Sequence, residues 1–228
     1  MQTQDVTMTL QPERLRMTYE DYLEWASEDV HAEWVDGEAV IEMPPGTLHQ
    51  DVVTFLIALL RFFVQFYRLG VVLTAPYEMK VTAEANAREP DILFVAHEHL
   101  EYLVAQRLTG PADLIVEVVS QESVGRDRAE KFYEYQESGI REYWVIDPRP
   151  GKERADFWIL DAGGRYQPVL PGKDGVYRST EIPGFWFDPR WCFGEERPDP
   201  LFCFAQIIGL PEAMVAQLRA IAARGPQV

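Results

Sequence analysis

Hydrophobic and polar residues follow two different spacings along this chain, and the two spacings predict a mixture of helices and strands. Residues 47–67 carry apolar side chains at helical spacing, which predicts one long amphipathic or buried helix. Residues 91–96 (DILFVA) and 113–120 (DLIVEVVS) are short, almost continuous apolar runs, typical of strands buried on both faces of a sheet. The pattern therefore indicates an α/β (α+β) fold in which helices flank a mixed central sheet.

The N-terminal part of the pattern predicts a loose leader over residues 1–16, followed by a short helix and a hairpin. Thr18 begins T-Y-E-D, an N-cap with an acid three residues later, and the helix is expected to run to about Ala26. From His31 to Met43, two strand-like runs flank Asp36-Gly37. This dipeptide supplies the positive φ angles that a tight hairpin turn requires.

Further elements are expected up to residue 194. Strands are predicted at 71–75, 77–81 and 141–147, a short helix and loop at 97–109, and a helix from about Gly125 to Ser138. Residues 154–180 alternate short strand-like pieces with glycine-rich turns, which indicates an antiparallel extension.

Residues 17–194 are therefore interpreted as one domain, followed at 195–228 by a linker and a C-terminal helical appendage. The linker is the charged segment 195–200, and residues 211–224 have the spacing of an amphipathic helix. Between them, the apolar run 201–210 (LFCFAQIIGL) fits two interpretations, a cover on the core or the interface of a homodimer.

Composition narrows the class of protein. With 228 residues, 47% of them hydrophobic, the chain can fill one core, which excludes a disordered protein. The longest apolar stretch is interrupted by Arg61, Gln65 and Arg68, so we expect no membrane span. The first residues lack the pattern of a secretory signal, and Cys192 and Cys203 form no C-x-x-C pair. We therefore expect a cytoplasmic protein without a disulfide framework.

The net charge of −16 is unusual for a protein that grips nucleic acid, because such proteins normally present a basic surface to phosphate. One interpretation is a solubilising surface. The other is that some of the carboxylates converge and need a cation to be stable together. Composition alone leaves both open.

Two carboxylates stand out because of the strands that carry them. Glu117 lies inside the run L-I-V-E-V-V, where a buried charge is costly unless it faces a cleft or meets a cation. Asp91 opens the other buried run. Each alone has an ordinary explanation, a buried ion pair with an arginine for Glu117 and a solvated strand start for Asp91. Together, two carboxylates entering one region of a sheet suit a hard divalent ion such as Mg²⁺ or Mn²⁺.

Seven segments between Met17 and Phe193 carry a resemblance to a known family. They are M-T-Y-E-D-Y-L, E-W-V-D-G-E, His49, R-E-P-D-I-L-F-V, G-P-A-D-L-I-V-E-V-V-S, R-D-R-A-E-K-F-Y-E-Y and G-I-R-E-Y-W-V-I-D-P. In this order they resemble the bacterial putative restriction endonuclease family of the PD-(D/E)XK nuclease superfamily. The resemblance implies a restriction-endonuclease-like core.

In that superfamily, the aspartate of the P-D motif and an acid on the next strand hold one or two divalent ions, and a lysine follows two residues after the acid. By this resemblance, Asp91, Glu117 and the backbone carbonyl of Val118 are ligands of Mg²⁺ or Mn²⁺. The position of the lysine is Val119, so an apolar side chain stands where a cation is expected, on the same strand face as Glu117.

Lys131, on the following helix, fits the displaced lysine of this group. We expect its ammonium to lie within direct or one-water reach of Glu117 and to act in catalysis. The alternative is an i,i+4 salt bridge with Asp127. The resemblance also assigns Glu33 to an acid that reaches the metal directly or through water, and His49 to an accessory position. Their ordinary alternatives are a solvated hairpin position and a local role in the first turn of a helix.

The combined expectation is a divalent-metal-dependent phosphodiesterase, an endonuclease acting on DNA. A nuclease-fold binding or assembly module with a decayed site is the alternative, which Val119 and the acidic charge favour. A nuclease acting on RNA or a small nucleotide is a further alternative. We also expect cations around the cleft and solvated acids beside it. The cations are some of Arg88, Arg126, Arg128 and Lys131, and the acids are Asp113, Glu122 and Asp127.

Overall fold

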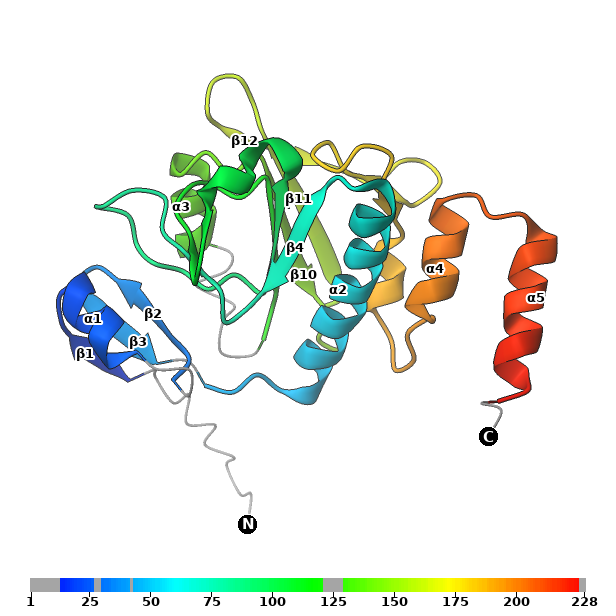
Figure 1. Cartoon of the computed structure of the whole chain (residues 1–228), viewed down its shortest axis with the longest axis horizontal. Coiled ribbons are helices and arrows are strands. Elements are labelled where there is room, and N and C mark those ends of the chain that lie inside the picture. Colours follow the sequence, from blue (N-terminus) through cyan, green and yellow to red (C-terminus); the bar gives the residue numbers. More distant parts are fainter. Residues whose placement is uncertain (1–12, 27–29, 42, 121–128, 226–228) are drawn as a thin grey trace, which may run out of the picture.

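A six-stranded mixed sheet forms the centre of the molecule (Figure 1). The computed structural model describes residues 13–26, 30–41, 43–120 and 129–225. In the order β12-β11-β10-β9-β6-β4, the strands of the central sheet are Tyr166–Val169, Arg154–Leu160, Glu142–Asp147, Leu114–Val118, Ile92–Ala96 and Gly70–Thr74. β9 and β10 are parallel and the other neighbours are antiparallel. The carboxyl ends of β9 and β10 therefore reach the same edge as the start of β6.

The two faces of this sheet are covered by different helices. Ile92, Phe94 and Val116 belong to the core beneath α2 (Thr47–Tyr67), whereas Leu93 and Ile115 belong to the core beneath α3 (Lys131–Glu137). Side chains alternate between the faces of a strand, so a strand covered on both sides must be apolar at nearly every position. This explains the two apolar runs and confirms the predicted mixed sheet flanked by helices.

The long helix α2 is the one helix in the described part of the chain that is long and apolar enough to cross a membrane, by length and composition only. Its apolar face lies against the sheet. Eight of its side chains are buried, and they are Val52, Val53, Phe55, Leu56, Leu59, Leu60, Phe63 and Val64. The helix is therefore part of the hydrophobic core, as its spacing predicts.

A small N-terminal unit packs around its own cluster of apolar residues. It consists of β1 (Arg14–Arg16), α1 (Tyr19–Trp25), β2 (Ala32–Val35) and β3 (Glu38–Ile41), with the sheet order β1-β3-β2. The side chain of Thr18 accepts a hydrogen bond from the backbone of Asp21, which confirms the predicted cap. Asp36 and Gly37 have φ angles of 51° and 81°, as the predicted hairpin turn requires.

Some short elements differ from the sequence expectation. β1 lies within residues 1–16, where no element is predicted, because a three-residue edge strand has too few apolar positions to show a period. The strand predicted at 77–81 is only β5 (Glu78–Met79), and the loop within 97–109 contains a hairpin after the 3₁₀ helix η1 (His97–Tyr102). β7 (Leu103–Val104) and β8 (Arg107–Leu108) form this hairpin, and β5 joins it in a separate sheet.

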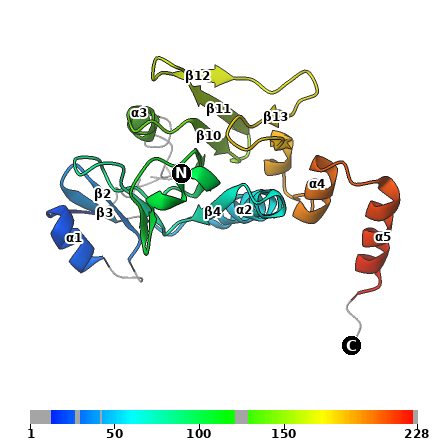
Figure 2. The ribbon, with the colours of Figure 1, turned by 45° about the horizontal axis from the view of Figure 1, so that its top comes forward.

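The C-terminal part extends the core and then leaves it. β13 (Tyr177–Arg178) pairs with β14 (Trp186–Phe187), and the 3₁₀ helix η3 (Pro189–Cys192) follows. α4 (Pro200–Ile207) packs on α2, with the ring of Phe204 5.8 Å from Phe62 and 5.4 Å from Phe66. The apolar run 201–210 thus covers the core within one chain. Figures 1 and 2 both show α5 (Glu212–Ala223) standing apart from the rest of the molecule.

Candidate active site

Strand pairing brings the two predicted carboxylates to the same place. β6 and β9 are antiparallel with Ile92 opposite Val116, so one step further along Asp91 stands opposite Glu117. Opposite residues share a sheet face, and their Cβ atoms are typically about 5 Å apart. The Oδ2 atom of Asp91 also accepts a hydrogen bond of 2.7 Å from the backbone N–H of Val118. Asp91 is therefore fixed against the strand that carries Glu117.

Glu117 meets two donors from α3. Its Oε1 atom accepts hydrogen bonds from Lys131 Nζ at 2.9 Å and from Tyr135 Oη at 2.7 Å. Only 2% of Glu117 and 4% of Lys131 are exposed, so this ion pair is buried. The expected contact between Lys131 and Glu117 is confirmed. Lys131 and Tyr135 are one helical turn apart, which places both over the same point of the strand.

Glu33 lies on the far side of Lys131. Its Oε1 atom is 3.4 Å from Lys131 Nζ and accepts the Glu89 N–H at 3.1 Å, while Oε2 accepts from Arg88 Nη1 at 2.7 Å. Burial raises the pKa of this carboxyl, but the charges of Lys131 and Arg88 outweigh burial and lower the pKa to about 2. Glu33 is therefore a charged partner of Lys131.

Arg88 is buried inside this network. It is 2% exposed and binds Glu33 on one side and Glu134 of α3 on the other, with its Nε atom 2.7 Å from Glu134 Oε2. Arg88 and Lys131 are two of the four residues among which the sequence predicts cations at the cleft rim, but both are buried and neutralise buried carboxylates. Arg126 and Arg128, the other two candidates, lie outside the described residues, so the presence of some of these cations at the rim stays a prediction.

His49 approaches Asp91 from the first turn of α2. Its Nε2 atom is 3.1 Å from Asp91 Oδ2. The N-terminal end of α2 and the start of β6 therefore meet at the same sheet edge. His49 contacts one predicted ligand directly, which a purely local role would not require.

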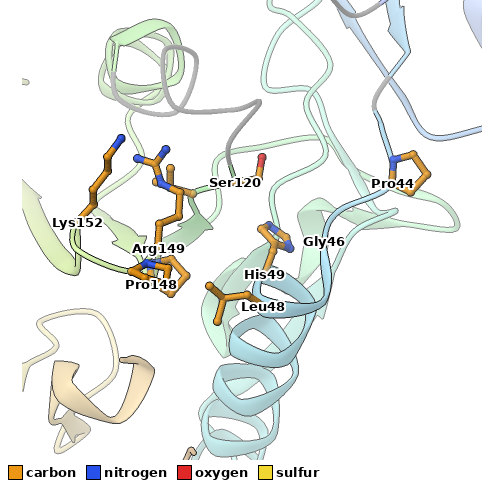
Figure 3. A pocket seen from close by; sticks show the side chains of 10 residues that line it. Pro44, Gly46, Leu48, His49, Ser120, Pro148, Arg149 and Lys152 are labelled. Atoms are coloured by element: carbon orange, nitrogen blue, oxygen red, sulfur yellow. The ribbon is translucent and has the colours of Figure 1, made fainter. Parts of the chain in front are cut away.

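A pocket of about 570 Å³ opens beside these residues (Figure 3). It is lined by Pro44, Gly46, Leu48, His49, Val119, Ser120, Pro148, Arg149, Pro150 and Lys152. Three parts of the chain supply this lining: the segment that leads into α2 together with the first turn of α2, the segment after β9, and the loop after β10. Val119 thus lines the pocket, as well as being part of the core beneath α3.

The sequence interpretation missed Tyr135, Arg149 and Lys152. The signal for Tyr135 is its position four residues after Lys131 on the same helix face. The signal for the other two is D-P-R-P-G-K directly after a buried strand. The carboxyl ends of parallel strands meet at one edge, and ligands often bind there.

The acids expected to be solvated beside the site behave differently. Asp113 lies at the opposite end of β9 and is buried. Its Oδ2 atom accepts from the backbone N–H of Ala96 at 2.7 Å, and Oδ1 lies 2.8 Å from His99 Nδ1. The expectation of a solvated Asp113 is therefore wrong. Glu122 and Asp127 lie outside the described residues, and so does the alternative pair of Asp127 with Lys131.

The oxygen atoms of the site can provide only part of the coordination shell of a hard cation. Among the described residues, no group of three or more His, Cys, Asp and Glu side chains forms a metal cage. Mg²⁺ commonly uses only one or two carboxylates and takes water and substrate phosphates for its remaining positions. Asp91, Glu117 and the carbonyl of Val118 therefore fit Mg²⁺ or Mn²⁺ as an incomplete, hard donor set.

Comparison with known proteins gives a family and a fold. The sequence model of the Uma2 family, described as putative restriction endonuclease, matches residues 19–190. No curated protein matches the chain. A solved structure from Anabaena variabilis, described as a putative nuclease belonging to DUF820, superposes with a TM-score of 0.62 at 12% identity. The match covers 76% of this chain and 96% of that one.

Proposed function

We propose, from the premise that this chain belongs to the Uma2 family of putative restriction endonucleases, that it is a divalent-metal-dependent phosphodiesterase acting on DNA. The observation that carries the proposal is the buried contact of 2.9 Å between Lys131 and Glu117, on the sheet edge that also holds Asp91. This contact supplies, from α3, the cation that Val119 cannot supply from the strand. We further propose that the central sheet and its helices are a restriction-endonuclease-like core and that the protein is cytoplasmic.

The side chains of the site have two roles in the proposed hydrolysis. The carboxylates would hold the metal ion, and Lys131 would interact with water or with the phosphate. Asp91, Glu117 and the carbonyl of Val118 would hold Mg²⁺ or Mn²⁺, which would supply an acidified water and neutralise charge on the phosphate. Asp91 is kept in place by the Val118 N–H. The Lys131 ammonium is held by contacts with two carboxylates, so it is placed to orient water or to stabilise negative charge on phosphate oxygens.

The experiment that tests this proposal combines metal binding with cleavage. Wild-type protein should melt at a higher temperature as Mn²⁺ is added, because an ion that binds only the folded state stabilises it. It should also cut DNA with Mg²⁺ or Mn²⁺. Asp91→Asn and Glu117→Gln should lose both responses, since each removes a charged ligand while keeping nearly the same shape.

Glu101→Gln is the matched control, because Glu101 is exposed and lies on η1 at the other end of β6. It should behave like the wild type. A panel of DNA, RNA and mononucleotides separates the proposed substrate from its alternatives. If Mn²⁺ leaves the melting temperature of the wild type unchanged and no substrate is cut, the protein is a binding or assembly module that retains the fold.

A further inference from the structure

A tight turn presents two cations to the pocket. The backbone N–H of Lys152 donates a hydrogen bond of 2.9 Å to the carbonyl of Arg149, which closes a four-residue turn. Its central residues are Pro150 and Gly151, and Gly151 has a φ angle of 76°. Proline followed by a glycine with positive φ is typical of a type II turn. The turn therefore holds Arg149 and Lys152 close together, and both line the pocket.

The orientation of Arg149 is fixed by a neighbouring acid. Its Nε and Nη2 atoms donate to the two carboxylate oxygens of Asp147, each at 2.8 Å, and Asp147 is buried at the end of β10. A guanidinium has five N–H donors, so donors remain on its other edge. Within the described residues, Nη1 of Arg149 donates to no side chain and Lys152 forms no ion pair. The guanidinium is thus held in position with donors available.

These cations face the carboxylate site across one pocket. Figure 3 shows Arg149 and Lys152 on one side and His49 on the other, with Ser120 nearby. His49 contacts Asp91, and Ser120 follows Glu117 by three residues. A molecule bound at the turn would therefore lie next to the residues proposed to react.

We propose that Arg149 and Lys152 form a phosphate-binding site, which holds a phosphate of the substrate beside the one that is cleaved. The planar fork of Arg149 matches two phosphate oxygens, and Lys152 adds a mobile point charge. On a chain with a net charge of −16, such local cations are needed to attract a polyanion. The identity of the ligand as a nucleic acid rests on the proposed function, whereas the binding of phosphate does not.

The site is tested by binding in EDTA, so that no cleavage occurs. A fluorescein-labelled 20-nucleotide DNA duplex is titrated between 50 and 200 mM NaCl. Lys152→Ala should weaken binding about 5- to 10-fold and reduce the slope of log K against log salt by about 0.9, the loss of one phosphate contact. Arg149→Lys keeps the charge beside Asp147, so it should fold and weaken binding with little change in slope. Lys173→Ala, an exposed lysine outside the pocket, should bind like the wild type.

Two further measurements show which kind of phosphate ligand the site binds and whether the site can be correct when the proposed function is wrong. Calorimetry measures the binding of deoxyadenosine monophosphate to the wild type and to Lys152→Ala. Weaker binding by Lys152→Ala would support a phosphate site that also accepts a free nucleotide. If binding depends on Lys152 but no substrate is cleaved in Mn²⁺, the proposal of a phosphate site stands and the proposal of a hydrolase is wrong. If the wild type, Lys152→Ala and Arg149→Lys cleave DNA with equal kcat/KM, the proposal of a hydrolase stands and the proposal of a phosphate site is wrong. Absence of wild-type binding to both ligands also overturns it.

Discussion

At the scale of single residues, one ammonium joins two buried carboxylates. Lys131 contacts Glu117 at 2.9 Å and Glu33 at 3.4 Å, and Arg88 contacts Glu33 from the opposite side. Removing one partner of a buried ion pair typically costs about 3–5 kcal/mol, because the remaining charge stays unpaired. The charges of this network therefore depend on one another, and they stabilise the fold as well as the site.

The contribution of the Glu33 charge to the free energy of unfolding can be measured by changing the pH. Its pKa falls from 4.5 to about 2 on folding, so its charge stabilises the folded state above pH 4.5, and this contribution is lost as pH falls from 4.5 toward 2. The contribution at neutral pH is about 3 kcal/mol, since one pKa unit corresponds to about 1.4 kcal/mol. Glu33→Gln should therefore be destabilised at pH 7, and its deficit against the wild type should shrink as the pH falls from 5 to 3.

Urea unfolding of both proteins at pH 7, 5, 4 and 3 measures this deficit. Glu101→Gln, which changes an exposed acid, serves as the control for general acid effects. A deficit of the same size at every pH would show that Glu33 contributes packing rather than charge.

At the scale of elements, the two C-terminal helices differ in what they bury. α4 buries Cys203, Ala205 and Ile207 and covers aromatic rings of α2. In α5, only Val215 is buried among the described residues, and Arg219 lies 5.2 Å from the ring of Phe202. Helices of this length have little stability without tertiary packing. α4 is therefore part of the core, whereas α5 is attached to it by few contacts.

Truncation separates the two helices. A chain ending at Leu210 should keep its fold and melt within about 4 °C of the full chain, since a loss of about 1 kcal/mol shifts a domain of this size by that much. A chain ending at Asp199 should melt far lower or aggregate, because it exposes the face of α2 that α4 covers. Differential scanning calorimetry with circular dichroism measures both. Equal melting temperatures for the two truncations would contradict this division.

At the scale of the whole molecule, negatively charged residues greatly outnumber positively charged ones. With a net charge of −16, the negative side chains repel one another in the compact state. At 0.1 M, salt largely screens the repulsion between exposed charges that are more than about 10 Å apart. The ion pairs around Lys131 are buried and are screened much less. Salt should therefore relieve the surface repulsion while leaving the network of the site intact.

We expect the melting temperature to rise by a few degrees between 20 and 200 mM NaCl. Sucrose at matched osmolarity is the control, because it carries no charge and cannot screen. A melting temperature that falls with salt would show that exposed ion pairs, such as Arg178 with Asp174, outweigh the net repulsion.

Local chemistry determined the features that sequence analysis found. Thr18 caps its helix, Asp36-Gly37 makes its turn and residues 47–67 form one helix, because each depends on side chains a few positions apart. The strands of Asp91 and Glu117 were recognisable because burial on both faces leaves few polar positions. Lys131 was found as the partner of Glu117 by combining the helix pattern with the family resemblance.

Only the tertiary structure decided which distant segments meet. The burial of Arg88 between Glu33 and Glu134 joins β2 to α3, and no spacing along the chain encodes that contact. The positions of Arg149 and Lys152 in the pocket follow from the parallel pairing of β9 with β10, which brings the ends of both strands to one edge. A pattern of apolar residues specifies that a strand is buried, but not which strand it pairs with, because any apolar neighbour removes the same surface from water.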